Sequence, residues 1–211
     1  MAAVVAQVAP RIIIPGFFIG QSVKTMDDWG QISQTVAFSA LFITAITTLF
    51  QGEEQWLGII PGIAATAYYY MMKDPSNTER YRYTDWVFTT PLMLLAILKA
   101  AGGFSHAATL GIVASDVLMI GAGYIGVNET DAGRRHMWFA LGMLAFVPIL
   151  WVLFKMRANR TVVLGTLAVW TLYPIIWWLS EEKQITDTAT TVSYSVMDVV
   201  SKIGLITFLK F

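Results

Sequence analysis

The chain has no cysteine and little charge, and both shortages narrow what it can be. Without cysteine, its 211 residues cannot form a disulfide-stapled fold. Lys, Arg, Asp and Glu make up 13% of the residues, whereas soluble domains carry roughly 25%. The 14 basic and 14 acidic residues cancel, so the basic excess of a nucleic-acid-binding protein is missing. A hydrophobic fraction of 56% also excludes a disordered chain.

Long apolar runs fill most of the chain instead. A helix that crosses a bilayer needs about 20 mostly apolar residues, and clusters of charge divide the sequence into seven runs of about that length. The runs cover residues 32–50, 56–72, 81–99, 107–127, 137–154, 161–179 and 188–211. Together with a mean hydropathy of +0.59, they predict an all-α, multi-pass membrane protein. Residues 30–211 are expected to form one bundle of seven transmembrane helices in a lipid bilayer.

Residues 1–29 are expected to form an N-terminal arm that lies at the membrane interface or lacks fixed structure. The apolar stretch 12–19 is too short to span a bilayer and contains Pro15 and Gly16. A signal peptide is not expected, because no basic region precedes residues 2–9. We place the N-terminus outside, since this puts the basic link 155–160 inside. The Lys and Arg count over all links does not favour that orientation.

Once Lys99 and Lys210 are counted with the links at the ends of their runs, five charged residues remain inside the expected spans: Arg82, Asp85, Asp116, Asp198 and Lys202. Each costs about 2.5–3.5 kcal/mol at a helix centre on insertion scales, so each is a functional candidate. Arg82, Asp85 and Thr89 share one helix face at positions i, i+3 and i+7. Asp198 and Lys202 share another face at i and i+4. The two faces together hold two cations and two carboxylates.

A lysine removed from water has a specific chemical use. Its neutral amine can condense with an aldehyde, and nearby carboxylates then stabilise the protonated product. Asp85 and Asp198 are placed to supply that negative charge to Lys202. The pattern therefore suits a covalently held aldehyde cofactor. The alternative is a buried salt-bridge cluster that only fixes helix packing.

Aromatic residues are also spaced along single helix faces. Trp170, Tyr173 and Trp177 share one helix face in the pattern W-x-x-Y-P-x-x-W, and Trp86 follows Asp85 directly. Aromatic rings that face a pocket would confine a flat, conjugated ligand. The alternative is an ordinary aromatic core or an aromatic belt at the membrane interface.

Several of these motifs together resemble the microbial (type 1) rhodopsins. Residues 82–92, Arg-Tyr-Thr-Asp-Trp-Val-Phe-Thr-Thr-Pro-Leu, resemble their third-helix signature. Asp198-x-x-x-Lys202 resembles their retinal attachment site, and the pattern from Trp170 to Trp177 resembles their sixth helix. Smaller matches are Pro61 with Tyr68 in the second helix, and Ser115-Asp116 with Met119 and Gly123 in the fourth. The resemblance covers residues 30–211 and implies a seven-helix bundle with retinal in its core.

The resemblance also implies roles for single residues. Lys202 would carry all-trans retinal as a protonated Schiff base. Asp85 would be the primary counterion and proton acceptor, and Asp198 the second counterion. The supporting groups would be Thr89 on Asp85, Tyr68 and Tyr173 on Asp198, Arg82 as gate of the outward path, and Glu182 on the release side. The residues expected to line retinal are Trp86, Thr90, Met119, Gly123, Phe139, Trp170, Tyr173 and Trp177, with Thr90 also paired to Asp116.

One departure from the family pattern bears on the function. Outward proton pumps usually carry a carboxylate seven residues after Thr89, and Ala96 stands there. The resemblance therefore implies an outward proton pump with slow or unconventional reprotonation. A light-gated cation channel, as in some small viral rhodopsins, and a photosensor that signals to a transducer are the alternatives. Glu53 and Glu54 are expected to be solvated loop charges, and the alternative is that they line a cytoplasmic entrance.

Further properties are expected from the same reading. The resemblance implies a homo-oligomer, either a trimer or a pentamer. No enzymatic activity is expected. No metal site is expected either, because His106 and His136 have no Cys or carboxylate set around them.

Overall fold

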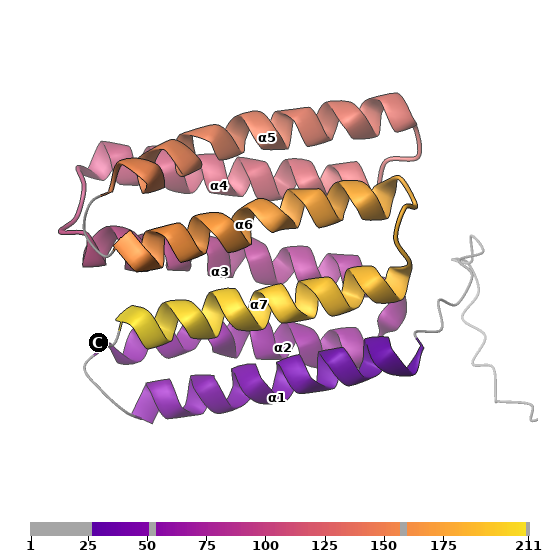
Figure 1. The fold of residues 1–211 in the computed structure, drawn as a ribbon, viewed down its shortest axis with the longest axis horizontal. Coiled ribbons are helices and arrows are strands. Elements are labelled where there is room, and N and C mark those ends of the chain that lie inside the picture. Colours follow the sequence, from indigo (N-terminus) through magenta and orange to yellow (C-terminus); the bar gives the residue numbers. More distant parts are fainter. Residues whose placement is uncertain (1–26, 51–53, 157–159, 210–211) are drawn as a thin grey trace, which may run out of the picture.

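Seven α-helices make up nearly all of the computed structural model, which describes residues 27–50, 54–156 and 160–209 (Figure 1). They are α1 (Asp28–Phe50), α2 (Ile59–Lys73), α3 (Thr78–Ala100), α4 (His106–Val127), α5 (Ala132–Lys155), α6 (Arg160–Glu181) and α7 (Asp187–Leu209). Two short 3-10 helices, η1 (Gln55–Gly58) and η2 (Pro75–Asn77), precede α2 and α3. These ranges contain no strand, and the predicted all-α bundle of seven helices is confirmed. Of the expected N-terminal arm, residues 1–26 lie outside the described residues, and α1 begins at Asp28.

Local chemistry explains where helices begin and end. Helix α5 begins at Ala132, earlier than predicted, because the carboxylate of Asp131 accepts a backbone N–H of the first turn at 2.8 Å. Helix α3 ends at Ala100, just before a pair of glycines. Gly102 and Gly103 have φ of 92° and 83°, and the Gly103 N–H donates to the Leu98 carbonyl at 2.9 Å. Only glycine adopts such φ values without strain.

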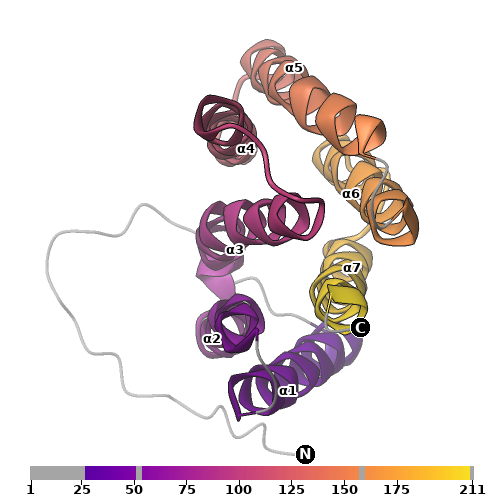
Figure 2. The same ribbon diagram turned by 90° about the vertical axis from the view of Figure 1, so that its left-hand side faces the viewer.

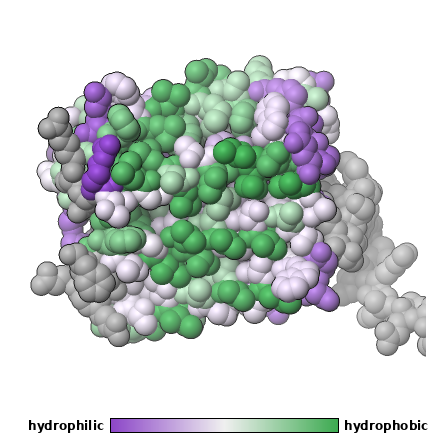
Figure 3. Space-filling model, in the orientation of Figure 1, coloured by the Kyte–Doolittle hydropathy of each residue, from purple (hydrophilic) through white to green (hydrophobic). Residues whose placement is uncertain are grey.

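The outer surface matches a bilayer. Apolar side chains cover its middle, and polar ones gather at the two ends of the long axis (Figure 3). Large exposed apolar residues include Phe42, Leu118, Leu144, Trp151 and Val200. By length and composition, α1 and α4–α7 can each cross a membrane. Helix α2 has only 15 residues, and the charged residues of α3 lower its hydropathy.

The helices enclose one interior, with α3 nearest its centre (Figure 2). Helix α1 packs against both α2 and α7, which closes the ring. We call the end of the bundle where α1 begins the N-side, and the opposite end the C-side. Helix α3 also begins at the N-side, so its early residues lie in that half and its late residues in the other.

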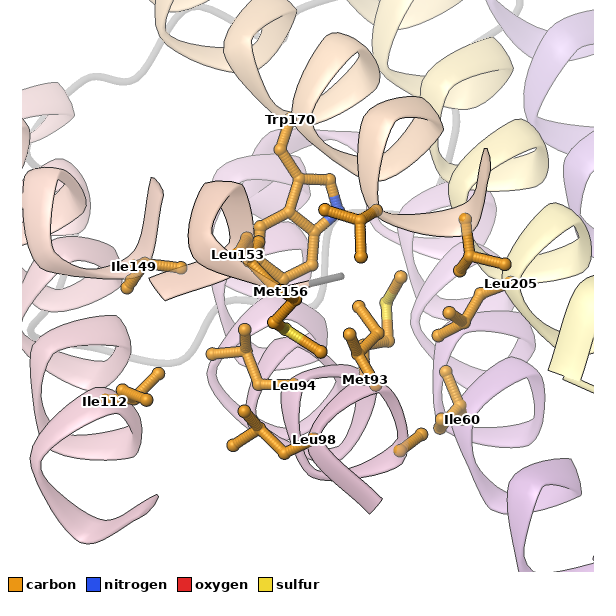
Figure 4. Close-up of a cluster of buried hydrophobic side chains, with 14 of the residues drawn as sticks. Ile60, Met93, Leu94, Leu98, Ile112, Ile149, Leu153, Met156, Trp170 and Leu205 are labelled. Atoms are coloured by element: carbon orange, nitrogen blue, oxygen red, sulfur yellow. The ribbon is translucent and has the colours of Figure 1, made fainter. Parts of the chain in front are cut away.

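The two halves of the interior differ in composition. The C-side half holds the largest apolar cluster, which includes Met93, Leu94, Leu153, Trp170 and Leu205 (Figure 4). Burial of one such side chain stabilises a fold by about 1.5–3 kcal/mol. The N-side half is aromatic, with a cluster that contains Tyr83, Trp86, Trp177 and Tyr194. Lys202 lies on α7 between Met197 of the aromatic cluster and Leu205 of the apolar one.

Candidate functional site

A lysine and two aspartates meet inside the bundle. Lys202 Nζ lies 3.0 Å from Asp85 Oδ2 and 2.8 Å from Asp198 Oδ1. Each of the three residues is only 1% exposed. Asp198 and Lys202 are one turn apart on α7, as predicted, whereas Asp85 is brought to them by the packing of α3 against α7. The two helix faces that the sequence singled out thus form one buried, ion-paired cluster.

Three neutral donors surround Asp198. Tyr68 of α2 donates to Oδ2 at 2.9 Å, and Tyr173 of α6 donates to Oδ1 at 2.9 Å. The indole N–H of Trp86 of α3 also donates to Oδ1, at 3.1 Å. Hydrogen bonds to an ionised carboxylate favour its charged form and offset part of the cost of burial. The contacts predicted from Tyr68 and Tyr173 are present, and the one from Trp86 was not foreseen.

Asp85 has fewer partners. The Thr89 hydroxyl lies 3.1 Å from Asp85 Oδ1 and 2.9 Å from the Asp85 backbone carbonyl, within donating distance of both. The next threonine, Thr90, donates to Asp116 Oδ2 of α4 at 2.6 Å. The other Asp116 oxygen, Oδ1, is buried and has no hydrogen-bond partner among the described residues. Both predicted threonine contacts are therefore present, and the one from Thr90 joins α3 to α4.

An apolar chamber adjoins the lysine, which forms part of its wall. Binding sites for small molecules are mostly apolar and carry only a few polar groups. All the residues predicted to surround a ligand line this chamber: Trp86, Thr90, Met119, Gly123, Phe139, Trp170, Tyr173, Trp177 and Lys202. A buried amine in the wall of a largely aromatic chamber fits a long conjugated aldehyde such as retinal.

Aromatic contacts shape the walls of the chamber. Phe139 stacks on Trp177 with ring centres 5.0 Å apart, and the Trp177 indole N–H donates to the Tyr83 hydroxyl at 3.0 Å. A Cβ atom at Gly123 would lie 3.0 Å from the Tyr83 ring. Because a side chain there would crowd Tyr83, glycine at this position lets α4 approach α3 closely.

Sequence reasoning missed other residues of the same chamber. Those unforeseen are Tyr83, Met93, Ile120, Trp138, Gly142, Met143, Phe146, Pro174, Tyr194 and Ser201. Phe139, Gly142, Met143 and Phe146 stand at i, i+3, i+4 and i+7 on α5. This helical spacing was a usable signal, because it places all four on the face that Phe139 already marked.

Arg82 and Glu182 were predicted to act on the outward path. Arg82 is 2% exposed and forms an ion pair with Glu79 one turn earlier on α3. Glu182 lies just beyond α6 and contacts His136 Nε2 of α5 at 2.7 Å. Both residues lie in the N-side half, but they have different partners. Glu79 was not singled out by the sequence, because it belongs to a polar segment that reads as a solvated link.

Ala96 belongs to the apolar cluster of the C-side half and is 3% exposed. At the same end, Lys99 Nζ lies 2.8 Å from both carboxylate oxygens of Glu54. Hydrogen bonds from Lys99, and then from Trp56, lower the pKa of the Glu54 carboxyl. Glu54 is a solvent-exposed charge, with 37% of its side chain exposed, and it is also paired with Lys99, because α3 ends opposite the segment before η1. Glu53 lies outside the described residues.

Comparison with known proteins decides the family. The family model described as bacteriorhodopsin-like protein matches residues 24–210. The chain belongs to this family. Among curated bacteriorhodopsin-like proteins, Bacteriorhodopsin of Halobacterium salinarum is 30% identical over 172 residues, which cover 69% of this chain and 65% of that protein. Archaerhodopsin-2 of a Halobacterium species is 30% identical over 69% of this chain and 66% of its own length. The chain thus spans slightly less than two thirds of these relatives.

Solved structures of bacteriorhodopsin-like proteins share the fold. The light-driven proton pump Coccomyxa subellipsoidea rhodopsin superposes with a TM-score of 0.77 at 27% identity, covering 90% of this chain and 99% of that one. Cyanorhodopsin from the cyanobacterium Tolypothrix superposes with a TM-score of 0.78 at 24% identity, covering 88% and 95%. The protein is therefore a multi-pass membrane protein with the seven-helix rhodopsin fold.

Proposed function

We propose that the protein holds all-trans retinal as a protonated Schiff base on Lys202 and acts as a light-driven outward proton pump. One observation carries this proposal: Lys202 Nζ lies between two buried carboxylates in the wall of an apolar chamber. Membership of the bacteriorhodopsin-like family supports retinal binding. The similarity to the Coccomyxa light-driven proton pump supports transport.

Retinal, when bound, would supply light absorption and a change of shape at the end attached to Lys202. The chain's own residues would manage the proton. Asp85 is placed to accept the proton from Lys202 Nζ across the 3.0 Å contact. Apart from Lys202, which contacts both carboxylates, Asp198 has three neutral side-chain donors and Asp85 has one, the Thr89 hydroxyl. Since such bonds favour the ionised form, Asp198 keeps its charge while Asp85 takes the proton.

In this proposal, proton release toward the N-side and proton uptake from the C-side would have different rates. Toward the N-side, Asp85 is followed by Arg82 and polar residues near the surface. Toward the C-side, a proton that returns to Lys202 meets the apolar cluster around Ala96. A positioned general acid typically accelerates proton transfer by about 10²–10⁴, and Ala96 cannot act as one. Reprotonation is therefore the slow step in this proposal.

Light-driven acidification tests the transport. Cells that express the chain, supplied with retinal in a weakly buffered medium, should acidify that medium under illumination, and a protonophore should abolish the change. No pH change would refute pumping. Photocurrents that reverse near the equilibrium potential of an ion would instead assign a light-gated channel. A light response that depends on a transducer would assign a sensor.

Colour tests the attachment site separately. Lys202→Ala should stay colourless with added retinal, because no amine remains to form the imine. Lys73→Ala is the matched control, since Lys73 lies at the surface end of α2, and it should keep the visible band. Retained colour in Lys202→Ala would refute the assignment.

The topology and the assembly are part of the same proposal. The N-terminus is placed outside, so the N-side faces the medium that acidifies. A tag at the N-terminus should then be accessible on intact cells. A trimer or pentamer remains the predicted assembly, and the mass of the detergent-solubilised protein measures it.

A further inference from the structure

Arg82 joins the surface of the bundle to its interior. Its side chain is 3% exposed, whereas that of its ion-pair partner, Glu79, is 46% exposed. The guanidinium carbon lies 4.5 Å from the centre of the Tyr194 ring, within the range of a cation–π contact. Among the residues that the structure describes, Glu79 is the one carboxylate that forms an ion pair with Arg82.

Other acidic groups of the N-side are engaged elsewhere. Glu182 contacts His136, and Glu129 contacts Arg134 at 3.3 Å. Asp74 accepts three hydrogen bonds, from Ser76 and Asn77 in its own link and from Tyr81 of α3. Glu79 differs from these acids, because its partner reaches into the half of the bundle that holds the Lys202 cluster.

We propose that Glu79 is a latch for Arg82: its carboxylate holds the guanidinium at the N-side end of α3, against Tyr194 and apart from Asp85 and Asp198. Glu79 is then a positioning residue, because it acts on the counterions only through Arg82. With the latch closed, Lys202 is the single cation among the described residues that forms an ion pair with Asp85 and Asp198. The optical test of this latch rests on the proposed retinal site.

Opening the latch changes the charge near the counterions. The ionisable groups that face Arg82 or its Tyr194 platform are Tyr68 of α2, Glu79 and Tyr83 of α3, Glu181 of α6, and Tyr194 and Asp198 of α7. Tyr68 and Tyr194 each interact with both Arg82 and Asp198. Once Glu79 loses its charge, Asp198 is therefore the buried carboxylate of this group toward which Arg82 can turn. A cation that comes near a carboxylate favours its ionised form.

The first experiment titrates the visible spectrum of the retinal-loaded full chain with acid. Protonation of the counterion shifts the band to the red, and the midpoint of this shift reports on the charge near Asp85. In Glu79→Gln the midpoint should fall by about one pH unit or more, within the range that a new opposite charge produces. Glu129→Gln removes a carboxylate at the same end that contacts Arg134 instead, and it should leave the midpoint in place. An unchanged midpoint in Glu79→Gln would overturn the latch, as would an equal shift in Glu129→Gln.

A double-mutant cycle separates a latch from a plain surface charge. If Glu79 acts only through Arg82, Glu79→Gln should have no further effect in an Arg82→Gln background. A shift of the same size in both backgrounds would overturn the proposal.

A second readout needs no retinal. In NMR spectra of arginine-labelled, retinal-free protein, the Arg82 guanidinium signals should show the ring-current shift of Tyr194. This shift should vanish in Glu79→Gln and remain in Glu129→Gln. Its persistence in Glu79→Gln would overturn the latch. A colourless protein that still shows the Glu79-dependent shift would refute retinal binding and support the latch.

Discussion

The N-side and C-side halves of the interior treat polar groups in opposite ways. In the N-side half, Asp198 alone collects hydrogen bonds from three other helices. In the C-side half, the corresponding depth is filled by Leu94, Ile97 and Leu205, each at most 4% exposed. The N-side half therefore stabilises buried charge, whereas the C-side half excludes it. In the proposed pump, a proton would meet polar partners on one side of Lys202 and an apolar barrier on the other.

The largest effect is expected at the polar half. Asp85→Asn keeps the shape of the side chain but removes the proton acceptor that faces Lys202 Nζ. Light-driven acidification should be lost, while a visible, red-shifted band remains because Lys202 is intact. Pump measurements on illuminated cells or vesicles check this, and undiminished transport would mean that Asp85 is not the acceptor.

The next effect should come from making the apolar half more like the polar one. Ala96→Asp adds a proton donor to the C-side cluster, so the slow recovery after a flash should accelerate by about tenfold or more, since a general acid contributes about 10²–10⁴. Time-resolved absorption measures this. Ala96→Asn is the control, because it has a similar shape and no proton to give. Equal rates in the two variants would place the slow step elsewhere.

A smaller effect concerns stability alone. Leu94 is 0% exposed in the C-side cluster, so Leu94→Ala should lower the free energy of unfolding by about 2–5 kcal/mol. Leu144 is 68% exposed on α5, and Leu144→Ala should change it by less than about 0.5 kcal/mol. Denaturant unfolding of the two variants compares them. Equal losses would contradict the view that the C-side half is a packed core.

The smallest effect belongs to the C-side surface. Because Lys99 lowers the pKa of Glu54 below its usual 4.5, the pair stabilises the fold above that pH and loses its effect as the pH falls through the lowered value. Lys99→Met should therefore unfold at a lower temperature than the unaltered chain near neutral pH. At strongly acidic pH the difference should disappear. Lys73→Met serves as the control, and a pH-independent difference for Lys99→Met would contradict the ion-pair explanation.

The sequence sufficed for those parts of the site that depend on helical spacing. Asp198 and Lys202 one turn apart, Asp85 with Thr89, and the stripe of Trp170, Tyr173 and Trp177 follow from periodicity. Their meeting across helices was inferred from resemblance, since spacing along one helix says nothing about which other helix it faces. The seven spans were visible because apolar length is a property of composition.

The contacts that could not be predicted from the sequence are those in which a side chain of one element reaches another element. Trp86 donates to Asp198 across 112 positions of sequence. Lys99 finds Glu54 in a segment that reads as solvent-exposed. Glu79 looked like one more charge in a polar link until the direction of the Arg82 side chain was known. Such pairs are set by helix rotation and rotamer, which no local pattern encodes.

The lysine cluster also divides into a local part and a distant part. Lys202 reaches Asp198 within four residues of one helix, but its contact with Asp85 joins positions 117 apart. The first contact can form as soon as α7 winds, whereas the second needs α3 docked in the assembled ring. If retinal is bound as proposed and Asp85 is its counterion, the colour of the chain would therefore report whether α3 has docked against α7.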